Sequence, residues 1–519
     1  MSLHPGISRR AFLRRTGVIA AASLVPACVR AQVSGANNAI RVGVAGLSRG
    51  RQLVSGILGL RSQGVRLVAL CDVDQERLAY AAELVAKDGI QVARYTDIRK
   101  MIADREVDAV VYATPNHWHA LGTIWACQAG KDVYVEKPVS HNVWEGRKMV
   151  EATRKYRRIV QTGTQCRSSR AIRESIAWVR EGHLGRITVA RGLCYKARPS
   201  IGLVAAPQPV PSGVDYDLWC GPAPRAELRR SRLHYDWHWN WETGNGDLGN
   251  QGVHQMDIAR WFLGEGALSP SVCSIGGRLG YRDDGQTPNT QIVHHAYAKA
   301  PLVFEVRGLP KAAPHRSEKN WSPHMDEFFG ADIGVVIHCE GGHVVVPTYT
   351  DAIAFDSSGR EVAHWSDAAG KHENLGAAIR GRPAEVTQKL RNELDRVHLR
   401  NFFATMRSRK EGELAADILE GHLSSALCHT GSISYQLGQA SAPGAIGAAL
   451  GGLAGGTDAW ERTREHLRAN GIDIESGSRL TLGPRLAMDP QRETFVGHEQ
   501  ANRLLTRPYR APFVVPEAV

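Results

Sequence analysis

The feature that most constrains this chain is a repeated alternation of short apolar segments and amphipathic segments. Four apolar segments have the length and composition of buried strands: 40–46, 65–71, 107–113 and 132–136. Helical patterns lie between them, for example at 75–89 and 119–130. Strands that alternate with helices in this way predict a parallel, doubly wound sheet. We place this sheet in a first domain spanning residues 39–160.

The pattern changes in the second part of the chain, residues 161–519. Segments 187–197 and 291–309 have the character of strands in a more open, antiparallel sheet, and 397–410 and 416–438 have that of helices. The Gly/Ala-rich segment 439–456 predicts a loop. The chain is therefore expected to be an α/β protein whose first, nucleotide-binding domain is followed by a mixed α/β domain.

The N-terminus has the order of elements found in an export signal. A twin-arginine pattern at 8–13 (SRRAFL) is followed by an apolar stretch at 17–25 and a small-residue cleavage site at 29–31. We expect residues 1–31 to be a twin-arginine signal peptide and the mature protein to be periplasmic or secreted. Lipid attachment at Cys28 is the alternative, although the preceding proline makes a poor lipobox.

Composition argues against several other classes of protein. The formal net charge is +12, but five arginines and no acid lie in the first 38 residues, and the rest has no basic run with interleaved aromatics. Nucleic acid is therefore not an expected partner. The nine cysteines include no CxxC pair, so no metal site is predicted. No other apolar run reaches the roughly 20 residues of a membrane span.

The turn after the first predicted strand reads GLSRG. Small residues there let the backbone approach a pyrophosphate at a helix N-terminus, although a serine replaces the middle glycine of the dinucleotide fingerprint. An acid at the end of the next strand can bind ribose hydroxyls and repel a 2′-phosphate. NAD is therefore the predicted cofactor, and NADP is the alternative because Arg51 and its neighbour at 49 could meet a phosphate. The predicted cofactor-binding residues here are Gly46, Ser48, Arg49, Gly50 and Asp72.

Two further polar segments follow the third and fourth predicted strands. They are ATPNHWH at 113–119 and EKP at 136–138, and both fall at the carboxyl edge of the sheet, where ligands bind in such folds. A lysine held between a strand end and a proline can act as a proton donor or acceptor between cofactor and substrate. The predicted cofactor-binding residues of these segments are Thr114, Pro115, Asn116, His119, Glu136 and Lys137.

Taken together, these motifs resemble the Gfo/Idh/MocA oxidoreductase family. Further resemblance lies in GTQCRSS (163–169), YDLWCGPAP (216–224), WHWNWETGNGDLGNQGVHQMD (237–257) and a C-terminal stretch similar to the exported branch of the family. The resemblance implies an N-terminal Rossmann domain and a C-terminal α/β domain with an open, mostly antiparallel sheet. It also implies a substrate cleft between them, a dimer or tetramer, and NAD(P)-dependent chemistry on sugars, cyclitols or polyols.

By the same resemblance, catalysis is assigned to Lys137 and to the motif around residue 254. The family usually has an aspartate four residues before this histidine, whereas this chain has Asn250 before His254. Asparagine does not titrate, so the proton is expected to pass to His254, which ordinarily titrates near neutral pH. Lys137 would then stabilise charge on the substrate oxygen. Asp257, one helical turn later, either orients His254 or is structural.

The aromatic segment 234–242 (HYDWHWNWE) has two interpretations. Its tryptophans either pack into the core or form a platform for the C–H face of a sugar. The predicted substrate-binding residues are Gln165, Arg167, Trp237, His238, Trp239, Asn250 and His254.

These observations predict an exported NAD-dependent oxidoreductase that acts on a secondary hydroxyl of a sugar or glycoside. Its cofactor is expected to be tightly bound, because free NAD is scarce outside the cytoplasm. One alternative is a redox-neutral glycosidase that oxidises the sugar at C3 and eliminates the glycosidic group. Addition of water and reduction of the sugar would then regenerate NAD. Another is a sugar-binding protein without activity, which the missing aspartate at position 250 would explain.

Overall fold

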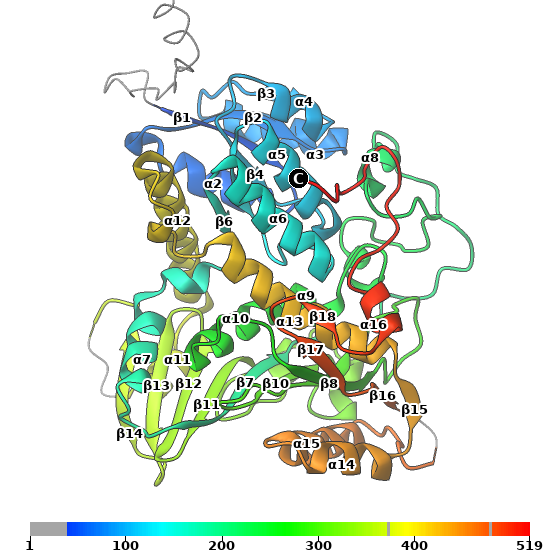
Figure 1. Cartoon of the computed structure of the whole chain (residues 1–519). Coiled ribbons are helices and arrows are strands. Elements are labelled where there is room, and N and C mark those ends of the chain that lie inside the picture. Colours follow the sequence, from blue (N-terminus) through cyan, green and yellow to red (C-terminus); the bar gives the residue numbers. More distant parts are fainter. Residues whose placement is uncertain (1–38, 371–373, 477–479) are drawn as a thin grey trace, which may run out of the picture. The chain divides into compact units, whose positions relative to one another are not determined.

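The computed structural model describes residues 39–370, 374–476 and 480–519, and residues 40–519 form one compact unit (Figure 1). The predicted signal peptide and Cys28 lie outside the described residues. Among the helices that are described, none has the length and apolar character needed to cross a bilayer.

The first sheet has six strands, all parallel, in the order β3-β2-β1-β4-β5-β6. The strands are β1 (Ile40–Ala45), β2 (Val65–Cys71), β3 (Ala93–Tyr95), β4 (Ala109–Tyr112), β5 (Asp132–Val135) and β6 (Val160–Thr162). The strand order reverses between β1 and β4, so the turns that follow these two strands form a crevice at the carboxyl edge of the sheet. The predicted doubly wound sheet is confirmed.

Helices connect these strands, and side-chain caps fix where several of them begin. Asp74 accepts hydrogen bonds from the amides of Glu76 and Arg77 at 2.9 and 3.2 Å, which satisfies the first turn of α3. The helices of this part are α2 (Gly50–Leu58), α3 (Gln75–Ala86), α4 (Ile98–Ala103), α5 (His119–Gln128) and α6 (Val143–Tyr156). Sequence analysis did not identify β3 and β6, because three residues are too few to show a periodic pattern.

The second sheet is mixed and mostly antiparallel, as predicted, with only β7 and β10 parallel along its main path of ten strands. That path runs β14-β13-β12-β11-β7-β10-β9-β8-β16-β15. The strands are β7 (Ile187–Tyr195), β8 (Ser271–Gly277), β9 (Thr290–His295), β10 (Leu302–Arg307), β11 (Ile333–Cys339), β12 (Gly342–Thr348), β13 (Asp351–Asp356), β14 (Glu361–Ser366), β15 (Gln439–Ser441), β16 (Leu480–Leu482), β17 (Leu486–Asp489) and β18 (Thr494–Phe495).

The largest apolar core lies between this sheet and the helices that pack on it. Val253, Met256 and Phe262 of α10 are fully buried there beside Leu427 of α13. The helices of the second part are α7 (Arg170–Arg180), α8 (Tyr216–Cys220), α9 (Gly246–Asn250), α10 (Gly252–Leu263), α11 (Leu375–Arg380), α12 (Ala384–Ser408), α13 (Ile418–Gln436), α14 (Pro443–Gly451), α15 (Gly456–Ala469) and α16 (Glu499–Arg503).

Two segments from late in the chain return to the first sheet. Leu399 and Phe402 of α12 join the core that covers β1, and a Cβ on Gly56 of α2 would lie 2.8 Å from Leu399, so glycine permits this close packing. Phe513 packs edge-on against Trp118 with ring centroids 5.4 Å apart. The first sheet ends with β6, which extends two residues past the predicted boundary at residue 160, and parts of residues 161–519 pack against this sheet.

The predicted loop at 439–456 is also wrong over most of its length. Residues 439–441 form β15, and α14 begins at Pro443, a residue suited to the first turn of a helix. Alanine favours helix, and Ile446 and Leu450 are buried against Trp460 of α15. The apolar spacing of Ile446 and Leu450 was hidden by the surrounding glycines.

Candidate active site

A cavity of about 430 Å³ lies over the carboxyl edge of the parallel sheet and extends to the aromatic segment of the second part. We call it the central pocket. Of the residues predicted to bind cofactor or substrate, those that line it are Gly46, Ser48, Arg49, Asp72, Thr114, Pro115, Asn116, His119, Glu136, Lys137, Trp237, His238 and Asn250. The structure does not place Gly50, Gln165, Arg167, Trp239 or His254 in its lining.

The turn after β1 is shaped by Gly46, which has a φ of 84°. A Cβ at this position would lie 2.5 Å from the main chain of Ala113, so only glycine allows the turns after β1 and β4 to approach this closely. Asp72 at the end of β2 accepts a hydrogen bond from the Leu47 amide at 2.6 Å and holds the turn in place. The result is a narrow backbone cradle of the kind that receives a dinucleotide.

The chemistry of the pocket wall also fits such a ligand. Buried Thr114 Oγ1 and Asn116 Oδ1 have no hydrogen-bond partner among the described residues, and both residues line the pocket. Buried polar atoms in folded proteins are normally satisfied, so these atoms are suited to a polar ligand. Burial raises the pKa of Asp72, although the amides of Asp74 and Leu47 oppose this shift.

Arg49 does not present an unoccupied guanidinium to a phosphate. Its Nε lies 3.4 Å from Glu136 Oε1, and its Nη2 lies 3.3 Å from Asp395 of α12. These two carboxylates neutralise the arginine beside the cradle. The concern that Arg49 would recruit a 2′-phosphate is therefore weakened, although Arg49 itself lines the pocket.

Lys137 lies on the pocket wall directly after β5. Its Nζ donates a hydrogen bond to the main-chain carbonyl of Asn250, the last residue of α9. Burial lowers the pKa of Lys137 to about 8, with Glu136 opposing the shift and Lys196 adding to it. An amine with this pKa can both donate and accept a proton near neutral pH.

The structure corrects the role predicted for His254. Its side chain is buried in α10, its ring centroid lies 5.0 Å from that of Tyr349, and its Nδ1 has no partner among the described residues. Burial lowers its pKa well below the usual range, and the positive charges of Lys137 and Arg49 add to the shift. This shift opposes the predicted titration near neutral pH, and His254 does not line the central pocket.

The predicted substrate role of Arg167 is contradicted as well. Its guanidinium donates to both carboxylate oxygens of Asp257 at 2.8 Å and to Glu420 at 2.8 Å, and the side chain is only 7% exposed. Asp257 is thus bound to Arg167, which decides between its two interpretations in favour of a structural role. Gln165, in the same turn, is also buried and outside the pocket lining.

The aromatic segment divides between the two interpretations that were left open. Trp237 and His238 line the pocket, and their rings stack with centroids 3.7 Å apart. Trp239 is buried, and the guanidinium carbon of Arg198 lies 4.9 Å from its ring centroid. These residues fall in the short segment η4 (Asp236–Trp239), where two rings face the pocket and the third supports them.

Some pocket residues were missed by sequence analysis. His234 lines the pocket and its Nε2 lies 2.8 Å from Asp74, which ties the aromatic segment to the first domain. Trp219 and Asn245 also line it, and they lie inside the segments YDLWCGPAP and WHWNWETGNGD already noted above. His119 lines the pocket too, but its ring nitrogens face the carbonyls of Pro138 and Thr114 at 2.7 and 2.9 Å, which position both turns.

Comparison with known proteins agrees with this geometry. Residues 40–164 match a family model described as an oxidoreductase family with an NAD-binding Rossmann fold. Residues 179–298 match the model of the C-terminal α/β domain of the same family. The predicted NAD-binding Rossmann domain is confirmed.

Similar curated proteins include a 1,5-anhydro-D-fructose reductase of Ensifer adhaerens, 35% identical over 25% of this chain and 38% of that protein. A myo-inositol 2-dehydrogenase of Thermotoga maritima is 27% identical over 44% of this chain and 55% of that protein. The chain thus matches between about a third and about half of the length of these relatives.

Two solved structures share the fold. The WlbA dehydrogenase of Bordetella pertussis, in complex with NADH and UDP-GlcNAcA, has a TM-score of 0.51 at 20% identity, covering 76% of this chain and 95% of that one. A levoglucosan dehydrogenase in complex with NADH and levoglucosan has a TM-score of 0.52 at 18% identity, covering 75% and 95%. With both of its family models matched and the Rossmann cradle in place, the chain belongs to the Gfo/Idh/MocA family of oxidoreductases.

Proposed function

We propose that this protein is an NAD-dependent oxidoreductase that acts on a secondary hydroxyl of a sugar or glycoside. The observation that carries the proposal is the position of Lys137, a half-buried amine with a pKa of about 8, in the same pocket as the cradle at Gly46 and Asp72. Bound NAD would supply the hydride-transfer chemistry. The family and the named activities of its similar relatives support a carbohydrate substrate.

Lys137 would exchange a proton with the reacting oxygen of the substrate. When the amine is neutral it can accept the hydroxyl proton, and when it is charged it can donate to a carbonyl oxygen. The Asn250 carbonyl holds Nζ in place and, because it carries no full charge, leaves the pKa low.

The aromatic segment and Asn250, which line the pocket together with Lys137, would bind the sugar. Trp237 and His238 present stacked rings on which the C–H face of a sugar can lie, and Asn250 offers a polar edge for its hydroxyls. The overlap of aromatic and polar groups near Lys137 supports a carbohydrate rather than an apolar alcohol.

We further propose that the twin-arginine segment exports the folded protein with its cofactor already bound. Protein purified from the periplasm without added nucleotide should contain NAD(H), about one per chain. Nucleotide extracted from the protein would identify NAD or NADP directly. If the purified protein is folded but contains no nucleotide, and is active only when NAD is added to the assay, tight binding is contradicted.

The activity test is incubation of the purified protein with a panel of glycosides and sugars, following NADH absorbance and product masses together. Oxidised sugar formed with NADH would support the dehydrogenase. Cleaved glycoside without net NADH would instead identify the redox-neutral oxidation and elimination sequence. Binding without any product in the wild type would favour the non-catalytic alternative.

The preference for NAD rests on Asp72 and has its own test. Asp72→Ser removes the carboxylate that would repel a 2′-phosphate. Arg77, which also lines the pocket, would remain to meet that phosphate. We expect the ratio of NAD to NADP affinity to fall about tenfold or more, which corresponds to at least about 1.4 kcal/mol. An unchanged ratio would mean that Asp72 only shapes the turn.

A further inference from the structure

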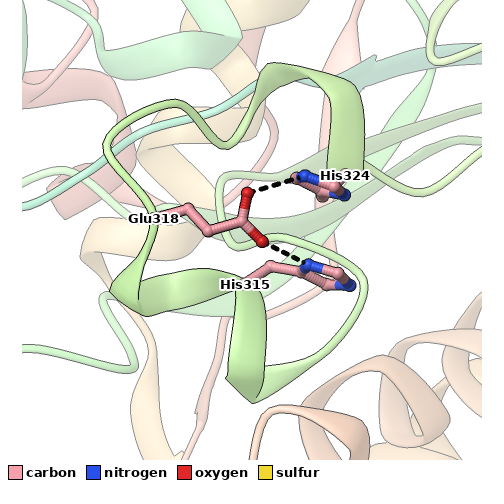
Figure 2. A group of neighbouring side chains, drawn as sticks. All are labelled: His315, Glu318 and His324. Carbon is pink, nitrogen blue, oxygen red and sulfur yellow. Dashed lines mark hydrogen bonds and ion pairs between the residues drawn. The ribbon is translucent and has the colours of Figure 1, made fainter.

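The loop between β10 and β11 gathers three metal-ligating side chains, His315, Glu318 and His324 (Figure 2). His315 Nδ1 lies 2.8 Å from Glu318 Oε1, and His324 Nε2 lies 2.8 Å from Glu318 Oε2. One ligand atom from each residue lies within 4.8 Å of the other two. None of the three lines the central pocket, so this cluster is separate from the proposed active site.

We propose that His315, Glu318 and His324 form a binding site for a divalent transition-metal ion, with Zn²⁺ as the favoured occupant. Two imidazoles and one carboxylate are nitrogen and oxygen donors that zinc accepts readily. Mg²⁺ and Ca²⁺ prefer sites built from oxygen alone. The donor set therefore selects for zinc and its neighbours in the first transition row.

The spacing of the ligand atoms is close to that of a zinc site. Zinc ligands lie about 2.0–2.1 Å from the metal, so the edge of a tetrahedral site is about 3.3 Å. The two nitrogen–oxygen distances of 2.8 Å need to open by only about half an ångström to reach that value. Because the two histidines meet different oxygens of Glu318, a turn of the carboxylate and of one imidazole ring would bring one oxygen and both nitrogens around the ion. A fourth position, open to solvent, would hold water.

The backbone fixes both histidines before any ion binds. His315 follows Pro314 in the short segment η5 (Ala313–Ser317), and His324 follows Pro323 in η6 (Ser322–His324). A proline restricts φ and so limits the conformations of each turn. Main-chain hydrogen bonds then hold the ligating residues, from the His324 amide to Trp321 at 2.9 Å and from the Glu318 amide to His315 at 3.2 Å.

Ion pairing alone gives a weak account of this geometry. The three side chains are between 26% and 43% exposed, and exposed ion pairs contribute little to stability. The His315 and His324 rings also lie nearly parallel, with centroids 4.1 Å apart and an angle of 7° between their planes. Because the coordinating lone pair of an imidazole lies in its ring plane, one of the two stacked rings must turn about its side-chain bonds before both nitrogens can bind the same ion.

The bound ion would act on the loop rather than on the substrate. Trp321, between the ligands, is buried with Leu309 and Met325 in a small apolar cluster under the loop. One ion bound by His315, Glu318 and His324 would restrict the movement of the loop over this apolar cluster. The site is local in sequence, His-x-x-Glu followed by a histidine six residues later, so little loop-closure entropy opposes its formation.

The test is a calorimetric titration: the full-length protein is treated with a chelator, the chelator is removed, and the heat of binding is measured as ZnCl₂ is added. We expect one Zn²⁺ to bind per chain and the melting temperature to rise. Co²⁺ in place of Zn²⁺ should give the visible absorption of a tetrahedral site containing nitrogen ligands. The absence of stoichiometric Zn²⁺ binding in the wild type would overturn the proposal.

Variants assign the ion to this loop. His324→Ala and Glu318→Gln should each weaken Zn²⁺ binding about tenfold or more, because a ligand is lost. His183→Ala is the matched control, since His183 forms a similar exposed pair with Glu181 at 3.2 Å but has no third ligand in the described structure. Binding that persists in the two ligand variants, or that is lost in the control, would overturn the assignment.

Discussion

Two cationic side chains inside this protein, those of Lys137 and Arg167, have very different partners. Lys137 in the central pocket donates to the main-chain carbonyl of Asn250 and makes no ion pair in the described parts of the chain. Arg167, in the core beneath α10, meets both oxygens of Asp257 and one of Glu420. Burial lowers the pKa of Lys137 to about 8, whereas for Arg167 the two carboxylates outweigh burial and the pKa is raised.

This difference separates chemistry from structure. A buried charge that is fully paired contributes to packing and cannot easily change its state. A cation withdrawn from water without a carboxylate partner has a lowered pKa, and when it also lines a pocket it can take part in proton transfer. The same contrast explains why Arg167, although it lies in a family motif, is not in the pocket.

The largest expected effect is on activity in Lys137→Met. Removal of the proton donor and acceptor should lower kcat by about 10² to 10⁴, while nucleotide content stays close to that of the wild type. The measurement is kcat with the best substrate of the glycoside panel, together with extraction of bound NAD(H). A loss of less than threefold would exclude Lys137 as the proton-transfer group.

Lys131→Met is the matched control for this variant. Lys131 Nζ also donates to main-chain carbonyls, those of Asp104 and Val107 at 2.8 and 2.7 Å, and burial also lowers its pKa. It does not line the central pocket. The kcat of Lys131→Met should therefore equal that of the wild type. This result would show that loss of a half-buried lysine is not in itself sufficient to lower kcat.

Arg167→Met should act on stability instead. The change leaves Asp257 and Glu420 buried or half-buried with fewer partners, which costs about 3–5 kcal/mol of unfolding free energy. KM and kcat of the folded fraction should change little, since Arg167 is outside the pocket. Urea denaturation and steady-state kinetics on the same preparation measure both. A raised KM with unchanged stability would restore the substrate role that sequence analysis assigned.

Lys137→Met should also change stability, in the opposite direction. The pKa of Lys137 falls from 10.5 to about 8 on folding, so burying the charged amine destabilises the wild type below pH 8. At pH 7 the variant should be more stable by about 2 kcal/mol, allowing for the lost hydrogen bond to Asn250. The gain should decline between pH 8 and 10.5, and above that the variant should be slightly less stable, because only the loss of the hydrogen bond to Asn250 remains. Denaturation curves at pH 7 and pH 10.5 test this, and a constant difference would contradict it.

Local patterns were sufficient to predict much of this protein. The ends of β1, β2, β4 and β5 placed Asp72 and Lys137 at one sheet edge, and the structure brings them into one pocket. Parallel strands make this inference reliable, because their carboxyl ends share an edge. The same reasoning could not reach His254, since its low pKa depends on burial and on charges from other elements.

Pairings between distant residues were beyond the sequence. Arg167 and Asp257 lie 90 residues apart, and nothing local distinguishes an arginine that binds substrate from one that binds a buried acid. In the same way, Leu399 and Phe402 show that α12 is amphipathic but not that the surface it covers belongs to the first sheet. Tertiary packing determines both the partner of Arg167 and the surface that α12 covers. The periodicity of a sequence shows which face of a helix is apolar, but not what that face packs against.

The smallest expected effect tests the departure at position 250. Asn250→Asp would restore the acid usual in the family and place a carboxylate beside Lys137, whose Nζ is already bound to the main chain of the same residue. A nearby negative charge favours the ammonium form, so the pKa of Lys137 should rise from about 8 by roughly one unit. For oxidation of the substrate, kcat/KM should increase as Lys137 loses its proton. The pH at the midpoint of this increase should therefore rise by the same amount.

Asn374→Asp is the control, because Asn374 caps α11, where aspartate serves equally well, and its added charge should leave the profile unchanged. If the pH dependence of kcat/KM does not shift in Asn250→Asp, the profile reports a group other than Lys137. The difference between Lys137 and Arg167 would then no longer distinguish a catalytic residue from a structural one.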